Sequence, residues 1–474
     1  MTRRISARAL APMLPPPSDR GPAYRELADH LRLLVLDGRV PLGVALPGER
    51  ELAAALGLSR TTVTGAYRLL REEGCLTGRQ GARSTTALPG GTGTSTPGPE
   101  APDGVLDLAY AALPAAPQAV HAAYAAALQD LPAHLPSHGY SPAGVDVLRG
   151  AVAGKYTARG LPTTPEQILV TSGAQHALHL VLRLVTAAGD RVVVDHPSYP
   201  HALDAVREAR CRPVPVALGS TGWDVEGFRA ALRQAAPTMA YVIPDFHNPT
   251  GRCMTGAERA EIVRAARESR TTLVVDETLV DLHLDGPSGP PTGAHHPDVI
   301  SIGSTSKSYW AGLRIGWIRA TPGTITRLAA ARPSVDMGSP IVEQLATAAL
   351  LRDPDVLPAR REQLRAQRAA LVALLGEHLP GWRFEVPPGG LSLWAELPEP
   401  VSSALAALAP RYGLRLAAGP RFGVDGAFER FLRLPFTLPV PDLERAVSGL
   451  ARADAALGST PLDAVSPTAA AQLA

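Results

Sequence analysis

The feature that most restricts how this chain can fold is a stretch of turn-forming residues at positions 87–104. Between Pro89 and Pro99 every residue is Pro, Gly, Thr or Ser. Such a segment cannot bury an apolar core, and its composition is typical of a flexible tether. The chain is therefore expected to be multidomain, with residues 21–86 folding before the tether and residues 105–456 folding after it.

The remaining segments and the cysteines set further limits. Residues 1–20 and 457–474 are rich in Pro, Ser, Arg or Ala, so both are expected to lack fixed structure. No run of eighteen apolar residues occurs, which predicts no membrane span. The cysteines Cys75, Cys211 and Cys253 show no metal-ligand spacing. We therefore expect reduced thiols, no bound metal and a cytoplasmic protein.

The two parts of the chain differ in charge. Residues 1–86 carry thirteen arginines and eight acidic residues, a net charge of +5. The rest of the chain has 33 basic and 36 acidic residues, a net charge of −3. A basic front end on a mildly acidic body indicates a polyanionic partner for the front end alone.

The front part has the pattern of a helix-turn-helix. Apolar residues recur at helical spacing from Ala23 to Leu36, and a short helix is predicted from Glu49 to Leu56. Gly57 ends the short helix, and Ser59 caps a third helix that runs to about Glu73. The front of this last helix is expected to enter the major groove of double-stranded DNA.

The candidate DNA contacts follow from this placement. They are polar or basic side chains at the front of the third helix, at the start of the preceding helix, and in a basic hairpin between two short strands at 75–78 and 82–86. The set is Ser59, Arg60, Thr61, Thr62 and Thr64, with Arg50, and with Arg79 and Arg83 in the hairpin. Helix-turn-helix followed by a basic hairpin is a winged helix.

Two motifs in this region carry a family resemblance. The segments Leu46-Pro47-Gly48-Glu49-Arg50-Glu51-Leu52-Ala53 and Ser59-Arg60-Thr61-Thr62-Val63 resemble the DNA-binding domain of GntR-type transcription regulators. The family usually has Ser where Gly48 stands. Because Gly caps a helix less well than Ser, the helix that follows is expected to fray slightly at its start.

The long part of the chain alternates apolar runs with amphipathic helices. Short apolar runs predict strands at 168–171, 192–195, 240–244, 273–276 and 299–302, and the stretches between them include helices at 174–185, 199–208 and 256–268. This alternation predicts an α/β domain with a mostly parallel sheet. Ligands bind beyond the carboxyl ends of the strands in such sheets.

Chemically interesting residues lie at those strand ends. Thr171-Ser172-Gly173-Ala174-Gln175 opens a helix with free amides that suit a phosphate. Tyr199 follows the next strand and could stack on a flat ring, and Asn248 is a donor after a third strand. Asp276 ends a buried strand, where its carboxylate needs a cation such as a protonated pyridine nitrogen.

Lys307 is the candidate reactive group. The chain has 46 Lys and Arg residues, and only Lys155 and Lys307 are lysines. A lysine can lose its proton near neutral pH and attack an aldehyde, which an arginine cannot do. The nearby Ser304, Ser306 and Arg314 suit a phosphate. An aldehyde that also carries a phosphate is pyridoxal 5′-phosphate.

The order of these motifs resembles fold-type I pyridoxal-phosphate-dependent aminotransferases over roughly residues 105–455. The resemblance implies that Lys307 forms the Schiff base, that Asp276 pairs with the pyridinium nitrogen, and that Asn248 bonds the ring hydroxyl. It also implies that Tyr199 stacks on the ring. The implied phosphate ligands are Ala174, Gln175, Ser304, Ser306 and Arg314.

Three further residues are assigned by the same resemblance. Arg433, inside the strand-like run 431–436, matches the arginine that clamps a substrate carboxylate. Tyr140 lies in a segment that resembles one near the subunit interface, and it is expected to reach the neighbouring site of a homodimer. Thr278 stands in for a tyrosine that relatives use at the ring hydroxyl, which puts efficient transamination in doubt more than cofactor binding.

A GntR-like front end joined to an aminotransferase-like body resembles the MocR family of regulators. This resemblance implies a transcription regulator that senses an amine, an amino acid or pyridoxal 5′-phosphate through aldimine formation at Lys307. The alternative is a catalytically active aminotransferase with an accessory DNA-binding domain. Steady product formation from an amino donor and a keto acid would favour the alternative.

Overall fold

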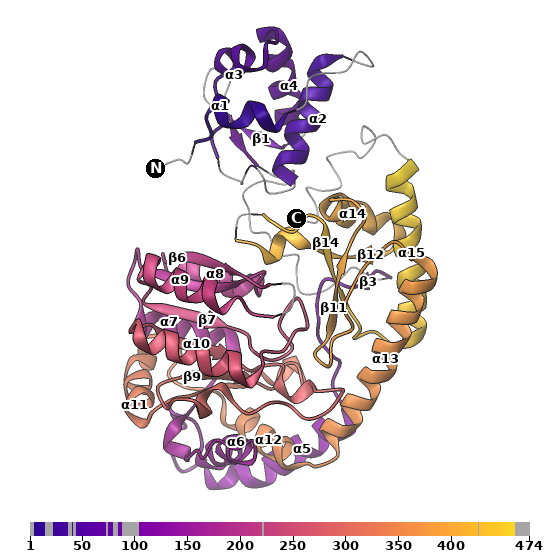
Figure 1. The fold of residues 1–474 in the computed structure, drawn as a ribbon. Helices are drawn as coiled ribbons and strands as arrows, with labels where there is room; N and C mark the ends of the chain where they lie inside the picture. Colours follow the sequence, from indigo (N-terminus) through magenta and orange to yellow (C-terminus); the bar gives the residue numbers. More distant parts are fainter. Residues whose placement is uncertain are drawn as a thin grey trace.

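The structure is a computed structural model that describes residues 4–14, 22–36, 40, 44–72, 74–78, 84–87, 104–219, 222–424 and 426–459. Arg79 and Arg83, most of the tether and the tail from residue 460 lie outside these residues. Figure 1 shows the N-terminal helices as one group and the remaining elements as a larger body. None of the described helices is long and apolar enough to cross a bilayer.

The N-terminal domain is the predicted winged helix-turn-helix. Its helices are α2 (Ala23–Leu36), α3 (Glu49–Leu56) and α4 (Arg60–Glu72), and its two-residue strands β1 (Leu76–Thr77) and β2 (Thr85–Thr86) pair antiparallel. The core between the helices is made of aliphatic and aromatic side chains with almost no exposed surface, including Leu31, Leu52, Val63, Tyr67 and Leu70. Gly57 ends α3 with a φ of 66°, as its sequence position predicts.

Residues 4–14 differ from the expectation of no fixed structure for residues 1–20. They contain α1 (Ala7–Leu10), which Ser6 caps, followed by a 3-10 turn at Ala11–Met13. Ala7, Leu10 and Leu14 lie at helical spacing, and all three are buried in the winged-helix core. The local content of Pro, Ser and Arg concealed this apolar stripe, whose burial stabilises the short helix.

The large domain is built on a seven-stranded sheet in the order β4-β10-β9-β8-β7-β5-β6. All strands run parallel except β10, which is antiparallel to both of its neighbours. This confirms the predicted mostly parallel sheet. The strands are β4 (Ile168–Thr171), β5 (Arg191–His196), β6 (Arg212–Ala217), β7 (Met239–Val242), β8 (Thr272–Asp276), β9 (Ile300–Ser304) and β10 (Gly316–Arg319).

Helices cover both faces of this sheet, because successive residues of a strand point to opposite faces and both sets are apolar. Val192 and Val194 pack with α7 (Ala174–Val185), α8 (Pro200–Glu208) and α11 (Pro322–Ala331). Val193, on the other face, packs with α9 (Val225–Ala235) and α10 (Gly256–Glu268). The helices α5 (Pro117–Asp130), α6 (Asp146–Ala158) and α12 (Ile341–Arg352) pack beside β4 and β10 (Figure 1).

The C-terminal part carries a smaller sheet in the order β11-β14-β13, with β14 (Phe431–Pro435) at its centre. The flanking strands are β11 (Ser392–Glu396) and β13 (Ala417–Ala418), and the covering helices are α13 (Val356–His378), α14 (Ser402–Leu408) and α15 (Val440–Ser459). A second strand pair joins β12 (Leu414–Arg415) in parallel to β3 (Leu106–Asp107), the first strand after the tether.

Candidate functional site

Lys307 lies in the turn that follows β9, at the carboxyl end of the parallel strands. Its Nζ donates a hydrogen bond of 2.7 Å to the carbonyl oxygen of Ala111. Burial, together with the nearby cation of Arg433, lowers the pKa of Lys307 from 10.5 to about 8. The amine is therefore far easier to deprotonate at neutral pH than an ordinary lysine.

Asp276 ends β8 on the next strand of the sheet, and its side chain is 9% exposed. One carboxylate oxygen accepts from the Tyr241 hydroxyl at 2.7 Å, and the other accepts from the Thr278 amide at 2.9 Å. The Thr278 hydroxyl is buried without a hydrogen-bond partner among the described residues. The Thr278 backbone thus helps to orient Asp276, and its side chain leaves a polar atom unsatisfied beside the carboxylate.

The start of α7 and Arg314 form a second group of donors. Gly173 has a φ of 95°, a backbone conformation that favours glycine, and a Cβ atom there would lie 2.8 Å from Nη2 of Arg314. Arg314 is otherwise exposed and donates to the Ser172 carbonyl at 2.9 Å. The backbone amide of Ala177 bonds the Gly173 carbonyl and is the first amide of α7 with a partner in the helix. The backbone amides of Ala174 and Gln175, which precede it, therefore have no partner within the helix.

Ser304 and Ser306 lie beside these donors at the end of β9. Their hydroxyl oxygens are 3.1 Å apart, and the Ser306 amide donates to the Ser304 hydroxyl at 3.2 Å. Helix-start amides, hydroxyls and a guanidinium suit a phosphate. With Lys307 just after β9 and Asp276 at the end of the neighbouring strand β8, the described residues fit pyridoxal 5′-phosphate: an amine for its aldehyde, a carboxylate for its ring nitrogen and donors for its phosphate.

Arg433 lies on β14, the central strand of the small sheet, and is 6% exposed. This placement is not that of a surface arginine on an edge strand. Its guanidinium donates to the Ala109 carbonyl and, at 3.5 Å, to the side-chain oxygen of Asn248, and it lies 5.2 Å from the centre of the Phe422 ring. Burial and the cation of Arg421 lower the pKa of Arg433 to about 10.

Two aromatic candidates have different environments. Tyr199 occupies the N-cap position of α8 without a side-chain hydrogen bond, and burial followed by the charge of Asp276 raises the pKa of its hydroxyl, so Tyr199 lies near Asp276. The side-chain nitrogen Nε2 of Gln175 donates to the His201 carbonyl at 2.8 Å, and the side-chain oxygen of Gln175 is buried without a described partner. Tyr140 is 60% exposed. The single chain therefore gathers the predicted cofactor residues but leaves Tyr140 on the surface.

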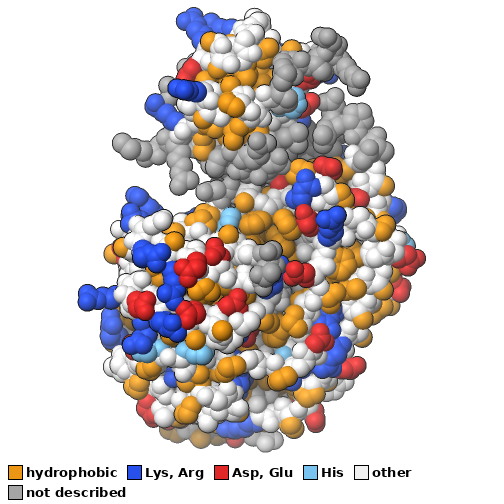
Figure 2. All heavy atoms as spheres, in the orientation of Figure 1, with side chains coloured by type: hydrophobic (Ala, Val, Ile, Leu, Met, Phe, Trp, Pro, Cys, Tyr) orange, Lys and Arg blue, Asp and Glu red, His pale blue; other side chains and the backbone are white. Residues whose placement is uncertain are grey.

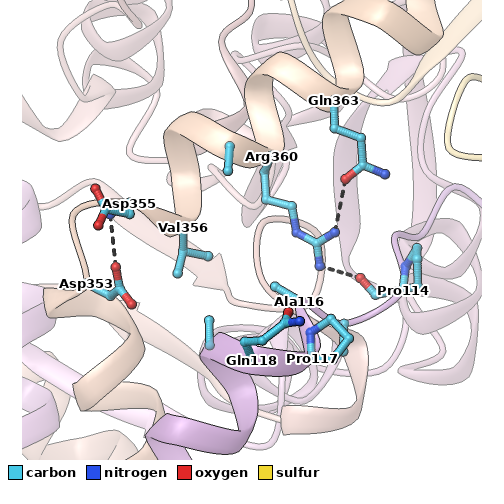
Figure 3. A pocket seen from close by; sticks show the side chains of 12 residues that line it. Pro114, Ala116, Pro117, Gln118, Asp353, Asp355, Val356, Arg360 and Gln363 are labelled. Carbon is cyan, nitrogen blue, oxygen red and sulfur yellow. Dashed lines mark hydrogen bonds between the residues drawn. The ribbon is translucent and has the colours of Figure 1, made fainter.

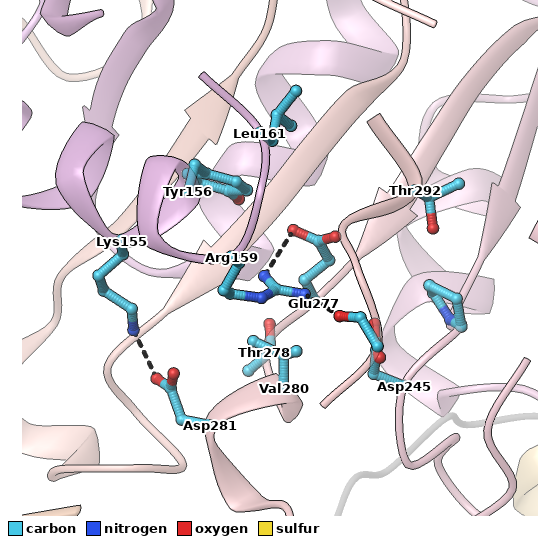
Figure 4. Close-up of polar contacts among 12 residues, drawn as sticks. Lys155, Tyr156, Arg159, Leu161, Asp245, Glu277, Thr278, Val280, Asp281 and Thr292 are labelled. Carbon is cyan, nitrogen blue, oxygen red and sulfur yellow. Dashed lines mark hydrogen bonds and ion pairs between the residues drawn. The ribbon is translucent and has the colours of Figure 1, made fainter. Parts of the chain in front are cut away.

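A layer of buried ion pairs supports the loop that follows β8 (Figure 4). Lys155 Nζ lies 2.6 Å from Asp281 Oδ2, and the same oxygen accepts from Ser308 Oγ at 3.2 Å. Arg159 lies 3.5 Å from Glu277. Burial alone would raise the pKa of Asp281, yet the Lys155 cation outweighs it and the pKa is lowered. Ser308, the residue next to Lys307, is thereby hydrogen-bonded to the Lys155–Asp281 ion pair.

At the winged helix, the predicted DNA-contacting residues fall into an outward and an inward set. Ser59 caps α4, because its hydroxyl accepts from the Thr62 amide at 3.0 Å. Arg60 and Thr61 are exposed at the front of this helix, and Arg50 is exposed on α3. Thr64 is turned inward and donates to Glu49 at 2.7 Å. In Figure 2, arginine side chains project from this domain at the top of the view.

Sequence reasoning missed several residues of the site. Tyr241, Ala109 and Ala111 supply hydrogen bonds to Asp276, Arg433 and Lys307, yet none belongs to a recognisable motif. Lys155 did carry a signal, because it is the other lysine of an arginine-rich chain.

Comparisons with known families divide the chain as the structure does. Residues 105–450 match the family described as aminotransferase class I and II. Residues 23–85 match the bacterial regulatory proteins of the gntR family.

Relatives of two kinds are similar to the chain. The uncharacterized HTH-type transcriptional regulator YisV of Bacillus subtilis is 27% identical, over 91% of this chain and 95% of its own length. The 2-aminoadipate transaminase of Thermus thermophilus is 29% identical, over 67% of this chain and 80% of its own. The crystal structure of LysN, an α-aminoadipate aminotransferase from Thermus thermophilus, has a TM-score of 0.69 at 28% identity and covers 76% of this chain and 94% of its own.

Proposed function

Because this chain belongs to the aminotransferase class I and II family and carries a GntR domain at its N-terminus, we propose that it is a DNA-binding transcription regulator. Its large domain binds pyridoxal 5′-phosphate and senses an amine, an amino acid or the cofactor itself at Lys307. The regulator YisV supports this function, because its similarity extends over both domains.

The observation that carries the proposal is a single segment that contacts both reactive groups of the site. We call residues 105–116 the strap. Its Ala109 carbonyl accepts from Arg433, and its Ala111 carbonyl accepts from Lys307. Its Pro114 carbonyl accepts from Arg360, as Figure 3 shows. The strap follows the tether directly, so it is the part of the large domain nearest in sequence to the winged helix.

The strap gives a ligand a way to change the conformation of the chain. The carboxylate of an amino acid is a stronger acceptor for Arg433 than a backbone carbonyl, so binding there competes with Ala109. A ligand that engages the Lys307 amine likewise competes with Ala111. When bound, pyridoxal 5′-phosphate supplies an aldehyde that reacts reversibly with amines. The strap is either held by Arg433 and Lys307 or released from them. A ligand alters DNA affinity only to the extent that it binds the released state more tightly than the held state.

A homodimer is part of this proposal. Large apolar side chains are exposed around the helices that flank β4, among them Leu128 at 59%, Leu135 at 67%, Tyr140 at 60% and Met337 at 41%. Exposed apolar side chains in one region favour burial against a partner surface. A second copy would cover them and would bring two winged helices to two half-sites on DNA.

The second candidate function is an active aminotransferase with an accessory DNA-binding domain. The similarity to 2-aminoadipate transaminase favours it, as does the lowered pKa of Lys307, which suits proton transfer as well as imine chemistry. The two functions differ in whether a keto acid is released with steady turnover.

The test is a titration of the purified holo-protein with candidate amines and amino acids. Visible absorbance reports the site, and binding to DNA selected by this protein from a random pool reports the winged helix. We expect at least one ligand to change both. The Lys307→Ala variant should lose the visible absorbance and the ligand response while it keeps DNA binding. A yellow Lys307→Ala protein, or absorbance changes that never alter DNA affinity, would contradict the proposal.

A further inference from the structure

The edge of the seven-stranded sheet that lies opposite the candidate functional site carries a row of arginines. Four neighbouring strands, in the order β8-β7-β5-β6, begin at this edge, each shortly after the helix that precedes it. The Arg212 amide donates to the Asp190 carbonyl at 2.7 Å, which joins the start of β6 to that of β5. The Thr238 amide donates to the Arg191 carbonyl at 3.1 Å, and the Thr272 amide donates to the Thr238 carbonyl at 3.0 Å. The four strand starts therefore lie side by side.

Positive charge is concentrated in the segments that enter these strands. The segments 186–191, 208–212, 233–238 and 267–272 carry six arginines and three acidic residues, a net charge of +3, although residues 87–474 as a whole carry −3. Figure 2 shows Lys and Arg side chains gathered at the left of the large body, where Figure 1 places β6, α8 and α9. We call the six arginines the arginine edge. All are exposed: Arg191, Arg210, Arg212, Arg233, Arg267 and Arg270.

Two of these arginines occupy positions where the end of a helix commonly has glycine. Arg210 follows α8 with a φ of 56°, and Arg270 follows α10 with a φ of 54°. The amides of the next residues, Cys211 and Thr271, reach carbonyls five residues back in the helix at 3.0 and 2.9 Å. Both helix ends are therefore Schellman motifs. The end of α6 has the same hydrogen bonds with Gly160 in this position.

Arginine is a costly residue at these two positions. A left-handed backbone costs a residue with a Cβ atom about 1 kcal/mol, and packing offsets little of this because both side chains are exposed. A cation near the carboxyl end of a helix gains about 0.3–1 kcal/mol from the helix dipole. Arg267, in the last turn of α10, already provides such a cation with an ordinary helical backbone. The strain at Arg210 and Arg270 therefore indicates a role outside the stability of the fold.

We propose that the arginine edge binds the phosphate backbone of double-stranded DNA beyond the base pairs that the winged helix contacts. This inference rests on the proposed function, because the winged helix brings the DNA to the large domain. Strands spaced about 4.8 Å apart extend the edge over about 14 Å, the length of about four base pairs at about 3.4 Å each. Guanidinium groups along this length suit consecutive phosphates of one DNA strand, and such contacts carry no sequence preference.

The test measures the salt dependence of DNA binding by the full-length holo-protein on two duplexes. Both contain the DNA that this protein selects from a random pool. One duplex ends at the base pairs that the winged helices protect, and the other extends on both sides by several helical turns. We expect a steeper salt slope on the extended duplex. The double variant Arg210→Gly/Arg270→Gly should lower that slope by about 1.8, because each lost phosphate contact contributes about 0.9, and should leave binding to the short duplex unchanged.

The glycine substitutions also separate DNA binding from folding. Glycine favours the left-handed backbone, so the double variant should melt at the temperature of the unmodified protein or above it. A weaker DNA complex then does not result from an unfolded large domain. The double variant Arg210→Lys/Arg270→Lys preserves the charge and should keep most of the slope. The matched control is Arg411→Gln, which removes an exposed arginine from the turn η8 (Ala409–Tyr412) and should keep all of it.

Four outcomes would contradict these expectations. Equal salt slopes of the unmodified protein on the two duplexes would overturn the role of the arginine edge and leave the proposed function standing. A slope that the glycine variant lowers equally on both duplexes would do the same, because the arginines would then act at the winged-helix site. Binding of poly-L-glutamate through the same arginines, with no difference between the duplexes, would assign the edge to an acidic protein instead. A protein that selects no DNA from the random pool would overturn both proposals.

Discussion

The amine of Lys307 is joined to the carbonyl oxygen of Ala111 by a hydrogen bond of 2.7 Å that spans 196 residues of sequence. Arg433 holds Ala109, two residues earlier in the same strap. The strap is further paired to β12 in the C-terminal part of the chain, because the amides of Leu106 and Leu108 donate to the carbonyls of Gly413 and Arg415, each at 2.8 Å. Lys307, Arg433 and the strand pair therefore all hold the strap in place.

The first prediction is that a ligand loosens this segment. In the full-length holo-protein, hydrogen exchange of the Leu106 and Leu108 amides should become faster when an amino acid that changes the visible absorbance is added. The reason is that the carboxylate of the ligand competes with Ala109 for Arg433, which leaves the strap with fewer contacts. Hydrogen exchange followed by mass spectrometry of peptides from 104–116 measures it.

A variant outside the ligand site serves as the control. Arg360 holds the Pro114 carbonyl and does not touch Lys307 or Arg433 in the described contacts. Arg360→Gln should speed exchange of the strap before any ligand is added, and the ligand should then cause a smaller further change. Exchange rates that stay the same with and without ligand would show that the strap does not respond.

The second prediction concerns pH. Burial and the Arg433 cation lower the pKa of Lys307 to about 8, so its neutral form is populated about one part in ten at pH 7. The rate at which apo-protein regains visible absorbance with pyridoxal 5′-phosphate should rise about tenfold per pH unit below this value and level off above it.

The control for this pH prediction is a variant that should raise the pKa of Lys307. The Arg433 cation disfavours the charged form of the Lys307 amine. Arg433→Gln removes this cation, so it should move the inflection of the pH profile upward. Burial remains in the variant, and the inflection should therefore stay below 10.5. A profile for the unmodified protein that keeps rising to pH 10 would mean that Lys307 is an ordinary exposed lysine.

Much of the site could be predicted because its residues belong to local patterns. Asp276 and Lys307 follow apolar runs that form adjacent strands β8 and β9, so strand order alone brings them together. Ser59 caps α4 because Ser at a helix start bonds the third amide. In each case a segment of a few residues determines the outcome.

The remaining contacts depend on packing between distant segments. Arg433 and Ala109 are 324 positions apart, and a backbone carbonyl has no signature in sequence. The antiparallel placement of β10 and the inward turn of Thr64 toward Glu49 likewise depend on tertiary neighbours. Sequence patterns predict which residues are polar at a strand end, but they do not predict which carbonyl will satisfy them.

The third prediction tests the capping of α3. Gly48 occupies the cap position in an extended conformation without a side-chain hydrogen bond, and a Cβ atom there would meet no atom within 4 Å. Gly48→Ser should therefore stabilise the winged helix by a few tenths of a kcal/mol, about the difference between Gly and Ser at this position. Slower hydrogen exchange of the first turn of α3 in the full-length protein measures the gain.

A second glycine of the same helix provides the contrast. Gly57 has a φ of 66°, a conformation that costs other residues about 1 kcal/mol. Gly57→Ser should destabilise the domain, although its Cβ would also meet no atom within 4 Å. If Gly48→Ser and Gly57→Ser change hydrogen exchange in the same direction, the missing cap at Gly48 does not determine the stability of the first turn of α3.

The fourth prediction separates the two sets of candidate DNA contacts. Arg60 is 59% exposed at the front of α4, and its nearest acid, Glu49, is 4.0 Å away, so the fold depends little on it. Arg60→Ala should weaken DNA binding and, if its guanidinium contacts a phosphate, reduce the salt slope by about 0.9.

Thr64→Val removes the hydrogen bond to Glu49 instead, which should cost about 1 kcal/mol of domain stability and leave the salt slope unchanged. Binding constants for the selected DNA at several salt concentrations, with thermal melts of each variant, measure both effects. An unchanged affinity for Arg60→Ala would remove this residue from the interface, and a changed slope for Thr64→Val would place the inward hydroxyl on the DNA.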